Sequence, residues 1–160
     1  MTLDIGLRKR LEFLVRVVGK EALHLRDTDA RLFSQLLAQA DMAQVGQDPL
    51  LAERLDAFVS RFGRLQDTLA DKFLPALLQA MAEPKGTALD NLDRAEKLGW
   101  LRSADQWLEL RRLRNQMVHE YIEDAAVLFN ALQAGHGFVP SLLETARRFM
   151  DQASQRLTRH

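Results

Sequence analysis

The side chains with the most chemical potential in this 160-residue chain lie close together, between Arg114 and Tyr121. The segment reads RNQMVHEY and places a guanidinium, an amide, an imidazole and a phenol within about two helical turns. Arginine binds phosphate through paired N–H groups, and histidine transfers protons near neutral pH. Tyr121 is the only tyrosine of the chain, and His119 is one of four histidines. These residue types predict phosphodiester chemistry.

The spacing of these residues predicts how they share the surface of a helix. Arg114 and Tyr121 are seven residues apart and lie on one face, whereas Asn115 and His119 are four apart and lie on a neighbouring face. The four side chains therefore border one groove and do not encircle the helix. That arrangement suits a substrate that lies along the helix surface.

Positive charge near this segment comes from Arg102, Arg111 and Arg112. Lys+Arg and Asp+Glu are equal at 22 each, so the molecule as a whole does not attract polyanions, and a phosphate site requires local clustering of this kind. A structural interpretation competes with the functional one. In it, the polar side chains cap carbonyls at the end of a helix or pair with Glu120 and Glu123.

A second polar run, RFGRLQD at residues 61–67, offers support for the first. Arg64 and Asp67 are candidates for the second wall of a cleft, in which Asp67 would support Arg114 or His119. The alternative is a solvated polar face opposite the apolar stripe of the same helix, and the pattern favours this alternative. Trp100 and Trp107 could stack a base, but aromatic residues at helical spacing more often belong to a core.

Helical periodicity extends along almost the whole chain, and strand-like alternation is nearly missing. We expect a first helix over about residues 4–24 and a shorter one capped by Asp27 or Thr28. Charged residues interrupt the apolar stripe of the first helix, which excludes a signal peptide, and no stretch has the roughly 18 uncharged apolar residues of a membrane span. Cysteine is absent, which suits a cytoplasmic protein.

The helix that follows is predicted to be long. Asp48 and Pro49 give its N-cap and first position, and apolar residues then recur in steps of three and four to Leu77. Pro75 lies within this pattern and is expected to kink the helix without ending it. A short helix over about residues 87–99 comes next, capped by a threonine and ended by a glycine.

The phosphate-binding candidates belong to the next helix. Ser103 and Gln106 form a capping-box pattern that opens it. Two endings are compatible with the sequence: a break just after Tyr121, or a continuation of the apolar pattern to Leu132. In both cases the candidate residues lie late in a helix.

The remaining residues predict a loop and a last helix. Gly135-His136-Gly137 is expected to be the loop, and Ser141 with Glu144 is expected to open the helix. With 47% hydrophobic and 28% charged residues, the chain has the composition of one globular domain that spans residues 1–160. We therefore predict an all-α, up-and-down bundle of four main helices with one or two short helices.

The pattern R-N-x3-H-x-Y late in a helix of a small all-α protein resembles the HEPN superfamily, and most closely its HepT-like branch. Arg114 and His119 match the R-x4-H signature, Asn115 matches the polar position after the arginine, and Tyr121 matches the H-x-Y extension. As architecture the resemblance covers about residues 50–155. The first 45 residues have no counterpart, and we expect an added helical layer, an oligomer contact or a partner surface.

This resemblance implies a metal-independent endoribonuclease that works as a homodimer with a shared cleft, without a cofactor. His119 would act as general base on the ribose 2′-OH or as general acid on the leaving oxygen. Arg114 would hold the scissile phosphate, and Asn115 would orient the phosphate or the imidazole. The expected substrate is RNA, with tRNA as a first candidate, and the expected product is a 2′,3′-cyclic phosphate.

HepT-like toxins are usually paired with a minimal nucleotidyltransferase (MNT) antitoxin, which modifies the tyrosine of H-x-Y with AMP. By this resemblance Tyr121 is a regulatory position. The local charge and the second polar run add Arg64, Asp67, Arg111 and Arg112 as candidates to bind RNA or to support the catalytic residues. A related branch with the same helical fold does not cleave RNA and serves as a substrate-binding partner of nucleotidyltransferases. The sequence leaves both functions open.

Overall fold

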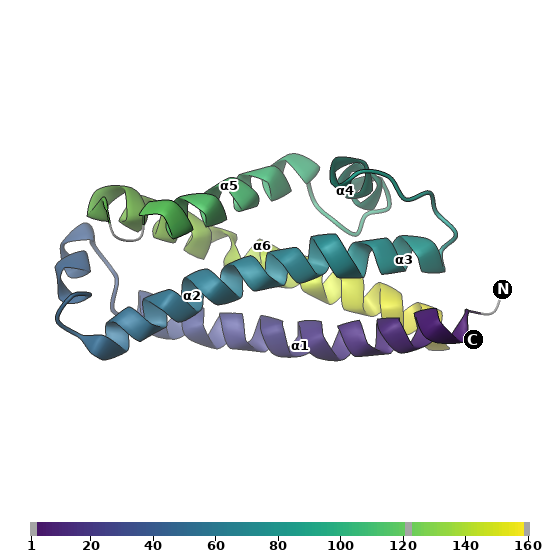
Figure 1. Cartoon of the computed structure of the whole chain (residues 1–160), viewed down its shortest axis with the longest axis horizontal. Helices are drawn as coiled ribbons and strands as arrows, with labels where there is room; N and C mark the ends of the chain where they lie inside the picture. Colours follow the sequence, from purple (N-terminus) through teal and green to yellow (C-terminus); the bar gives the residue numbers. More distant parts are fainter. Residues whose placement is uncertain (1–2, 121–122, 159–160) are drawn as a thin grey trace.

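The computed structural model describes residues 3–120 and 123–158, and these form an up-and-down bundle of α-helices (Figure 1). The main helices are α1 (Ile5–Phe33), α2 (Pro49–Asp67) with its continuation α3 (Leu74–Ala80), α5 (Ala104–Glu120) and α6 (Ala125–Thr158). Shorter elements are the 3-10 helix η1 (Gln39–Gln44), the π-helical segment η2 (Thr68–Phe73) and α4 (Ala88–Lys97). The start of α1 and the end of α6 lie at the same end of the bundle (Figure 1). The predicted fold class is confirmed.

Helix α1 packs along one side of the core over its whole length. Asp4 caps it by accepting hydrogen bonds from the backbone N–H groups of Gly6 and Leu7, and its buried side chains recur at helical spacing to Leu32. The predicted break at Asp27 or Thr28 is wrong. Thr28 is buried on the core-facing side, so the stripe continues through it and one helix extends to Phe33.

Helix α2 begins as predicted. The Asp48 carboxylate accepts from two backbone N–H groups of the first turn, and Pro49 occupies the first helical position. Pro75 does not end the helix, as expected, and the widened segment η2 lies directly before it. A proline has no N–H and its ring collides with the carbonyl four residues earlier, which a π-turn relieves. Leu74 accordingly donates to the carbonyl of Leu69, five residues back.

Helix α6 contradicts the predicted loop and final cap. Gly135-His136-Gly137 lies inside the helix, as does Ser141. A Cβ at Gly135 would collide with the terminal methyl group of Met117, so this glycine permits close packing of α5 and does not form a turn. The His136 ring stacks on Phe33 with centroids 4.2 Å apart, and its Nδ1 lies 2.7 Å from the Asp29 carboxylate.

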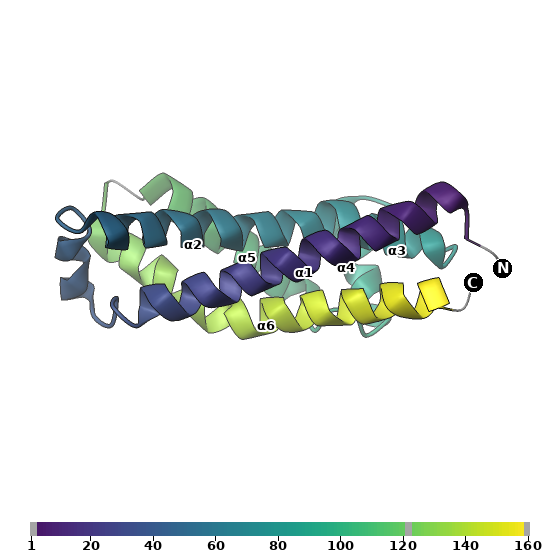
Figure 2. The ribbon, with the colours of Figure 1, turned by 90° about the horizontal axis from the view of Figure 1, so that it is seen from below.

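Helix α2 lies between α1 and α5, with α6 packed against both α1 and α5 (Figures 1 and 2). Thr87 caps the short helix α4, as predicted, and it forms a capping box with Asp90. Gly99, the predicted end of this segment, has a positive φ of 78°. No helix in the described ranges is long and apolar enough to cross a membrane. The two sides of α2 thus face different neighbours, and both carry polar side chains.

Candidate functional site

The phosphate-binding candidates lie on the last two turns of α5. Ser103 caps this helix through a 3.2 Å hydrogen bond from the Gln106 backbone N–H, as predicted. Helix α5 ends at Glu120, and Asp124 caps the next helix, α6. Of the two predicted endings, the structure is therefore close to the one just after Tyr121 and excludes one continuous helix to Leu132. Tyr121, the proposed regulatory residue, lies outside the described residues.

Arg114 is held against helix α2. Its Nη1 donates to the Asp67 carboxylate at 2.5 Å, and both side chains are partly accessible, at 36% and 42%. A Cβ on Gly63 would lie only 2.6 Å from Nε of Arg114, so the guanidinium packs directly on a glycine. The structure therefore brings Asp67 to Arg114, as the functional interpretation of the second polar run expected, although the carboxylate also remains in contact with solvent.

A second ion pair continues the contact between the two helices. Arg111 donates to the Asp71 carboxylate at 3.1 Å, one turn along each helix from the first pair. Arg112 points elsewhere and pairs with Glu109 on its own helix, and this contact raises the pKa of the arginine. Both predicted RNA-binding arginines of α5 are thus neutralised by carboxylates.

Asn115 and His119 are exposed on α5, and neither side chain hydrogen-bonds to any residue that the structure describes. Their four-residue spacing places them on one face, as expected. Arg114 and His119 are five residues apart, which separates their directions by about 140° around the helix. Within one subunit the arginine therefore faces α2 while the imidazole faces outward, so the prediction that these side chains border one groove is wrong for a single subunit. Glu123 is exposed and makes no ion pair within the described ranges, so it is not the partner of Arg114.

Arg64 lies on the exposed surface of α2, where its nearest hydrogen-bond partner is Ser60 at 3.3 Å. A partly buried carboxylate lies nearby: Glu21 of α1 accepts a 2.9 Å hydrogen bond from Thr68. Burial raises the pKa of Glu21, and the bond from Thr68 and the charge of Arg64 oppose the rise. One oxygen of this carboxylate is buried without a partner in the described chain.

Sequence reasoning missed two residues of the α2–α5 contact. Gly63 was part of a noted run but was given no role, although a glycine inside a strongly helical pattern usually has a packing reason. Asp71 was not considered, although it follows Asp67 by four residues and therefore shares its face. The two tryptophans, Trp100 and Trp107, are 3% and 1% exposed and belong to the core, which excludes base stacking at their present positions.

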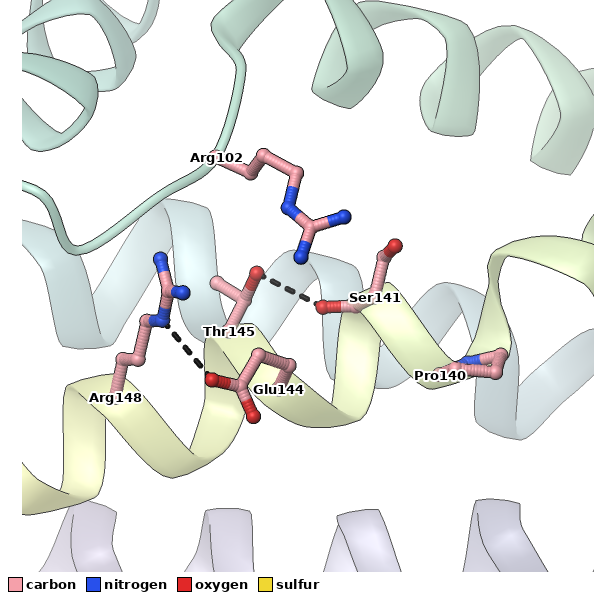
Figure 3. A pocket seen from close by; sticks show the side chains of 6 residues that line it. All are labelled: Arg102, Pro140, Ser141, Glu144, Thr145 and Arg148. Carbon is pink, nitrogen blue, oxygen red and sulfur yellow. Dashed lines mark hydrogen bonds and ion pairs between the residues drawn. The ribbon is translucent and has the colours of Figure 1, made fainter.

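A further charged cluster lines a pocket between the segment before α5 and helix α6 (Figure 3). Arg148 donates to Glu144 at 3.1 Å, and Arg147 binds the same carboxylate. These two arginines lower the pKa of Glu144 to about 2, so it stays ionised at neutral pH and cancels much of the local positive charge. Arg102 also lines this pocket, beyond the end of α5 that is opposite to Arg114. The prediction that Arg102 adds positive charge to the candidate site is therefore wrong.

Among residues 3–120 and 123–158, no group of three or more His, Asp or Glu side chains could hold a metal ion. A scan against protein-family models gives no match for this chain, nor does a search of curated proteins or of solved structures. The functional argument therefore depends on the residues themselves: a guanidinium seated on α2, with an exposed amide and imidazole on the neighbouring face of α5.

Proposed function

We propose that the chain is a metal-independent endoribonuclease of the HepT-like HEPN type, acting as a homodimer in a toxin–antitoxin pair. The observation that carries the proposal is the setting of Arg114. A permanent cation that is half-buried, packed on a glycine and hydrogen-bonded to Asp67 is held in one position. A fixed donor of this kind is what stabilisation of a transition-state charge requires.

The proposed reaction is an internal transfer at phosphorus. His119 removes the proton of a ribose 2′-OH, whose oxygen attacks the adjacent phosphorus. The bond from phosphorus to the 5′-oxygen breaks, and the leaving oxygen takes a proton, which yields a 2′,3′-cyclic phosphate and a 5′-hydroxyl end. Arg114 stabilises the charge on the phosphoryl oxygens, and Asn115 orients the phosphate or the imidazole.

The different directions of Arg114 and His119 support the dimer in this proposal. One phosphate cannot easily contact both residues of a single helix when their side chains diverge by about 140°. Two copies of α5, packed side by side, would instead place the imidazole of one subunit near the guanidinium of the other. The exposed Val118, with 55% of its surface accessible, lies between these residues and offers an apolar contact for such packing.

The test uses purified protein, without any partner, incubated with total tRNA in EDTA, beside the His119→Ala variant. We expect discrete cleavage by the wild type alone, with cyclic-phosphate ends, and equal dimer content for both proteins. Because His119 is exposed, its loss should leave the fold intact, which circular dichroism would check. Intact tRNA with folded, dimeric wild type would contradict the ribonuclease proposal.

A second function remains as the alternative: a non-catalytic, substrate-binding partner of a minimal nucleotidyltransferase. It is favoured by the neutralisation of Arg111, Arg112 and Arg114, because ion-paired arginines leave little free charge for RNA on α5. Co-purification with a nucleotidyltransferase, combined with intact tRNA in the assay above, would support this alternative.

A further inference from the structure

We propose that the groove between α1 and α2 binds the phosphate backbone of single-stranded RNA. This α1–α2 groove consists of two pockets that share Arg61. Its lining contains four arginines and one histidine: Arg31, Arg54, Arg61, Arg64 and His24. The inference deepens the proposed function and rests on it for the identity of the polyanion, RNA.

The arginines of the groove form a row along α2. Arg54, Arg61 and Arg64 span eleven residues, or about 15 Å of helix, and Arg31 of α1 lines the same pocket as Arg54. Arg54 donates to the Gln35 side chain at 2.6 Å, and Arg61 donates to the Thr28 hydroxyl. These bonds orient the guanidinium groups while leaving their charge in place, because both acceptors are neutral.

The charge of this row distinguishes it from the surface of α5 and from most of the α6 surface. None of its four arginines lies within 4.0 Å of a carboxylate among the described residues, whereas most arginines of α5 and α6 do. Two glutamates line the groove, the exposed Glu53 and the partly buried Glu21. The Oε1 atom of Glu21 accepts a hydrogen bond from Thr68, and its Oε2 atom is buried, so this carboxylate is turned away from a bound anion.

The groove leads to the candidate catalytic residues. Arg64 and Asp67 are three residues apart on α2 and are therefore neighbours on its surface, and Asp67 holds Arg114. A strand that follows the groove from Arg31 to Arg64 would cross the ridge of α2 and reach the last turns of α5. The groove thus provides the extended contact that a single fixed phosphate at Arg114 lacks.

The chemistry of the lining favours RNA over an anionic membrane surface. Every permanent cation that lines the two pockets is an arginine, whose planar fork matches phosphate oxygens in two-point contacts. A membrane surface would need a broad apolar face beside the charges, but Leu50 is the only large apolar side chain in the lining. No Phe, Tyr or Trp side chain of the described residues lines the groove for base stacking, so recognition should be largely independent of base identity.

The experiment measures fluorescence polarisation of a labelled 2′-O-methyl oligouridylate of about 20 nucleotides, titrated with protein at several salt concentrations. The probe has no 2′-OH nucleophile, so its binding is measured without cleavage. The test variant is Arg31→Gln/Arg54→Gln/Arg64→Gln, which leaves Arg61 to hold α1 against α2. The matched control is Arg26→Gln/Arg112→Gln/Arg147→Gln, which removes the same net charge from arginines that lie beside carboxylates.

We expect the groove variant to bind at least about 10-fold more weakly near 100 mM salt, with a salt slope reduced by about 2, and the control to change less than about 3-fold. If the groove variant does not fold, the single variants Arg31→Gln and Arg64→Gln should each reduce the slope by about 0.7. Equal losses in groove and control variants would overturn the proposal. Binding of wild type to phosphatidylserine vesicles but not to the probe would also overturn it.

The outcome separates the groove from the ribonuclease proposal. Probe binding that depends on the groove, together with intact tRNA in the cleavage assay, would remove the ribonuclease and keep the groove. Cleavage that depends on His119, with unchanged probe binding in the groove variant, would remove the groove and keep the ribonuclease.

Discussion

The two sides of helix α2 hold arginines in opposite electrostatic settings. Toward α5, Arg114 and Arg111 each donate to a carboxylate, at 2.5 Å and 3.1 Å. Toward α1, the arginines of the α1–α2 groove donate only to neutral oxygens. The same residue type therefore serves two purposes. A paired guanidinium is fixed in place and its charge is largely cancelled at a distance, whereas an arginine without a carboxylate keeps its long-range attraction.

This difference matches the two tasks that a nuclease has to perform. Chemistry at one phosphate needs a donor in a defined position, and the α2–α5 contact provides it. Retention of a long chain needs many weak contacts without strict geometry, and the groove provides them. The four predictions below change one side of α2 at a time.

The largest expected effect is on catalysis, from Gly63→Ala. The new Cβ would lie 2.6 Å from Nε of Arg114, so the guanidinium must leave its seat. We expect tRNA cleavage to fall by about 10²-fold, because small misplacements of a positioned group have large kinetic effects. Thermal stability should change little, since alanine favours helix by up to about 1 kcal/mol and offsets the lost contact. Gly137→Ala is the control, because nothing lies within 4 Å of its Cβ. Unchanged cleavage in Gly63→Ala would show that the packing of Arg114 on Gly63 is not needed for catalysis.

A smaller effect should follow from Asp67→Asn/Asp71→Asn, which makes the α5 side resemble the groove. Removal of both carboxylates restores the charge of Arg111 and Arg114, so affinity for the oligouridylate probe should rise by about 3- to 10-fold at about 50 mM salt. Stability to urea should fall by less than about 1 kcal/mol, because both pairs are partly exposed. Cleavage should nevertheless decrease, since Arg114 is no longer fixed. An unchanged affinity would mean that the carboxylates do not screen α5.

Glu21→Gln should produce a modest, pH-dependent change in stability. Burial raises the pKa of Glu21 in the folded protein. The folded state therefore retains the proton better than the unfolded chain, and this stabilising contribution is complete below the ordinary carboxyl pKa and is lost as the pH rises through the raised value. We expect the variant to melt about 1 to 3 °C above wild type at neutral pH and to match it in acid. Calorimetry at about pH 4 and pH 8 measures the difference, and an equal gap at both would exclude the ionisation as its cause.

The smallest effect is expected from Arg112→Gln. This arginine is 61% exposed and pairs with Glu109 on its own helix. Because its charge is already cancelled, probe affinity should change by less than about 2-fold, and thermal stability should not change measurably. Arg64→Gln, measured in parallel, should weaken binding more. Equal effects of the two substitutions would remove the distinction between paired and unpaired arginines.

Much of the fold was predictable because its signals are local. The N-caps at Asp48, Thr87 and Ser103 act on backbone groups within three residues, so the sequence displays them directly. The errors occurred where a residue serves a distant contact. Thr28 resembled a cap but receives a hydrogen bond from Arg61, and Gly135 resembled a turn but accommodates Met117.

The candidate site was predictable to a lesser extent. The spacing of Arg114, Asn115 and His119 placed them late in a helix, where the structure has them. The pairing of Arg114 with Asp67 joins residues 47 apart in sequence, and it depends on the antiparallel register of two helices. Periodicity alone does not define that register, so the pairing was one of two open alternatives and the role of Gly63 was not seen.

The widened turn η2 determines where the apolar stripe of the long helix points. Apolar residues advance by three and four up to Leu65, but the steps through Leu69 and Phe73 to Leu77 are all four. In a regular α-helix, three steps of four residues would rotate the apolar stripe by about 120° away from the core, slightly more than the roughly 100° that one residue contributes. The π-turn absorbs this extra residue. A one-residue deletion within η2 would therefore convert the π-turn to a regular α-turn and keep the apolar stripe on the core side. The same deletion within α2 would turn one side of that helix away from its present neighbours.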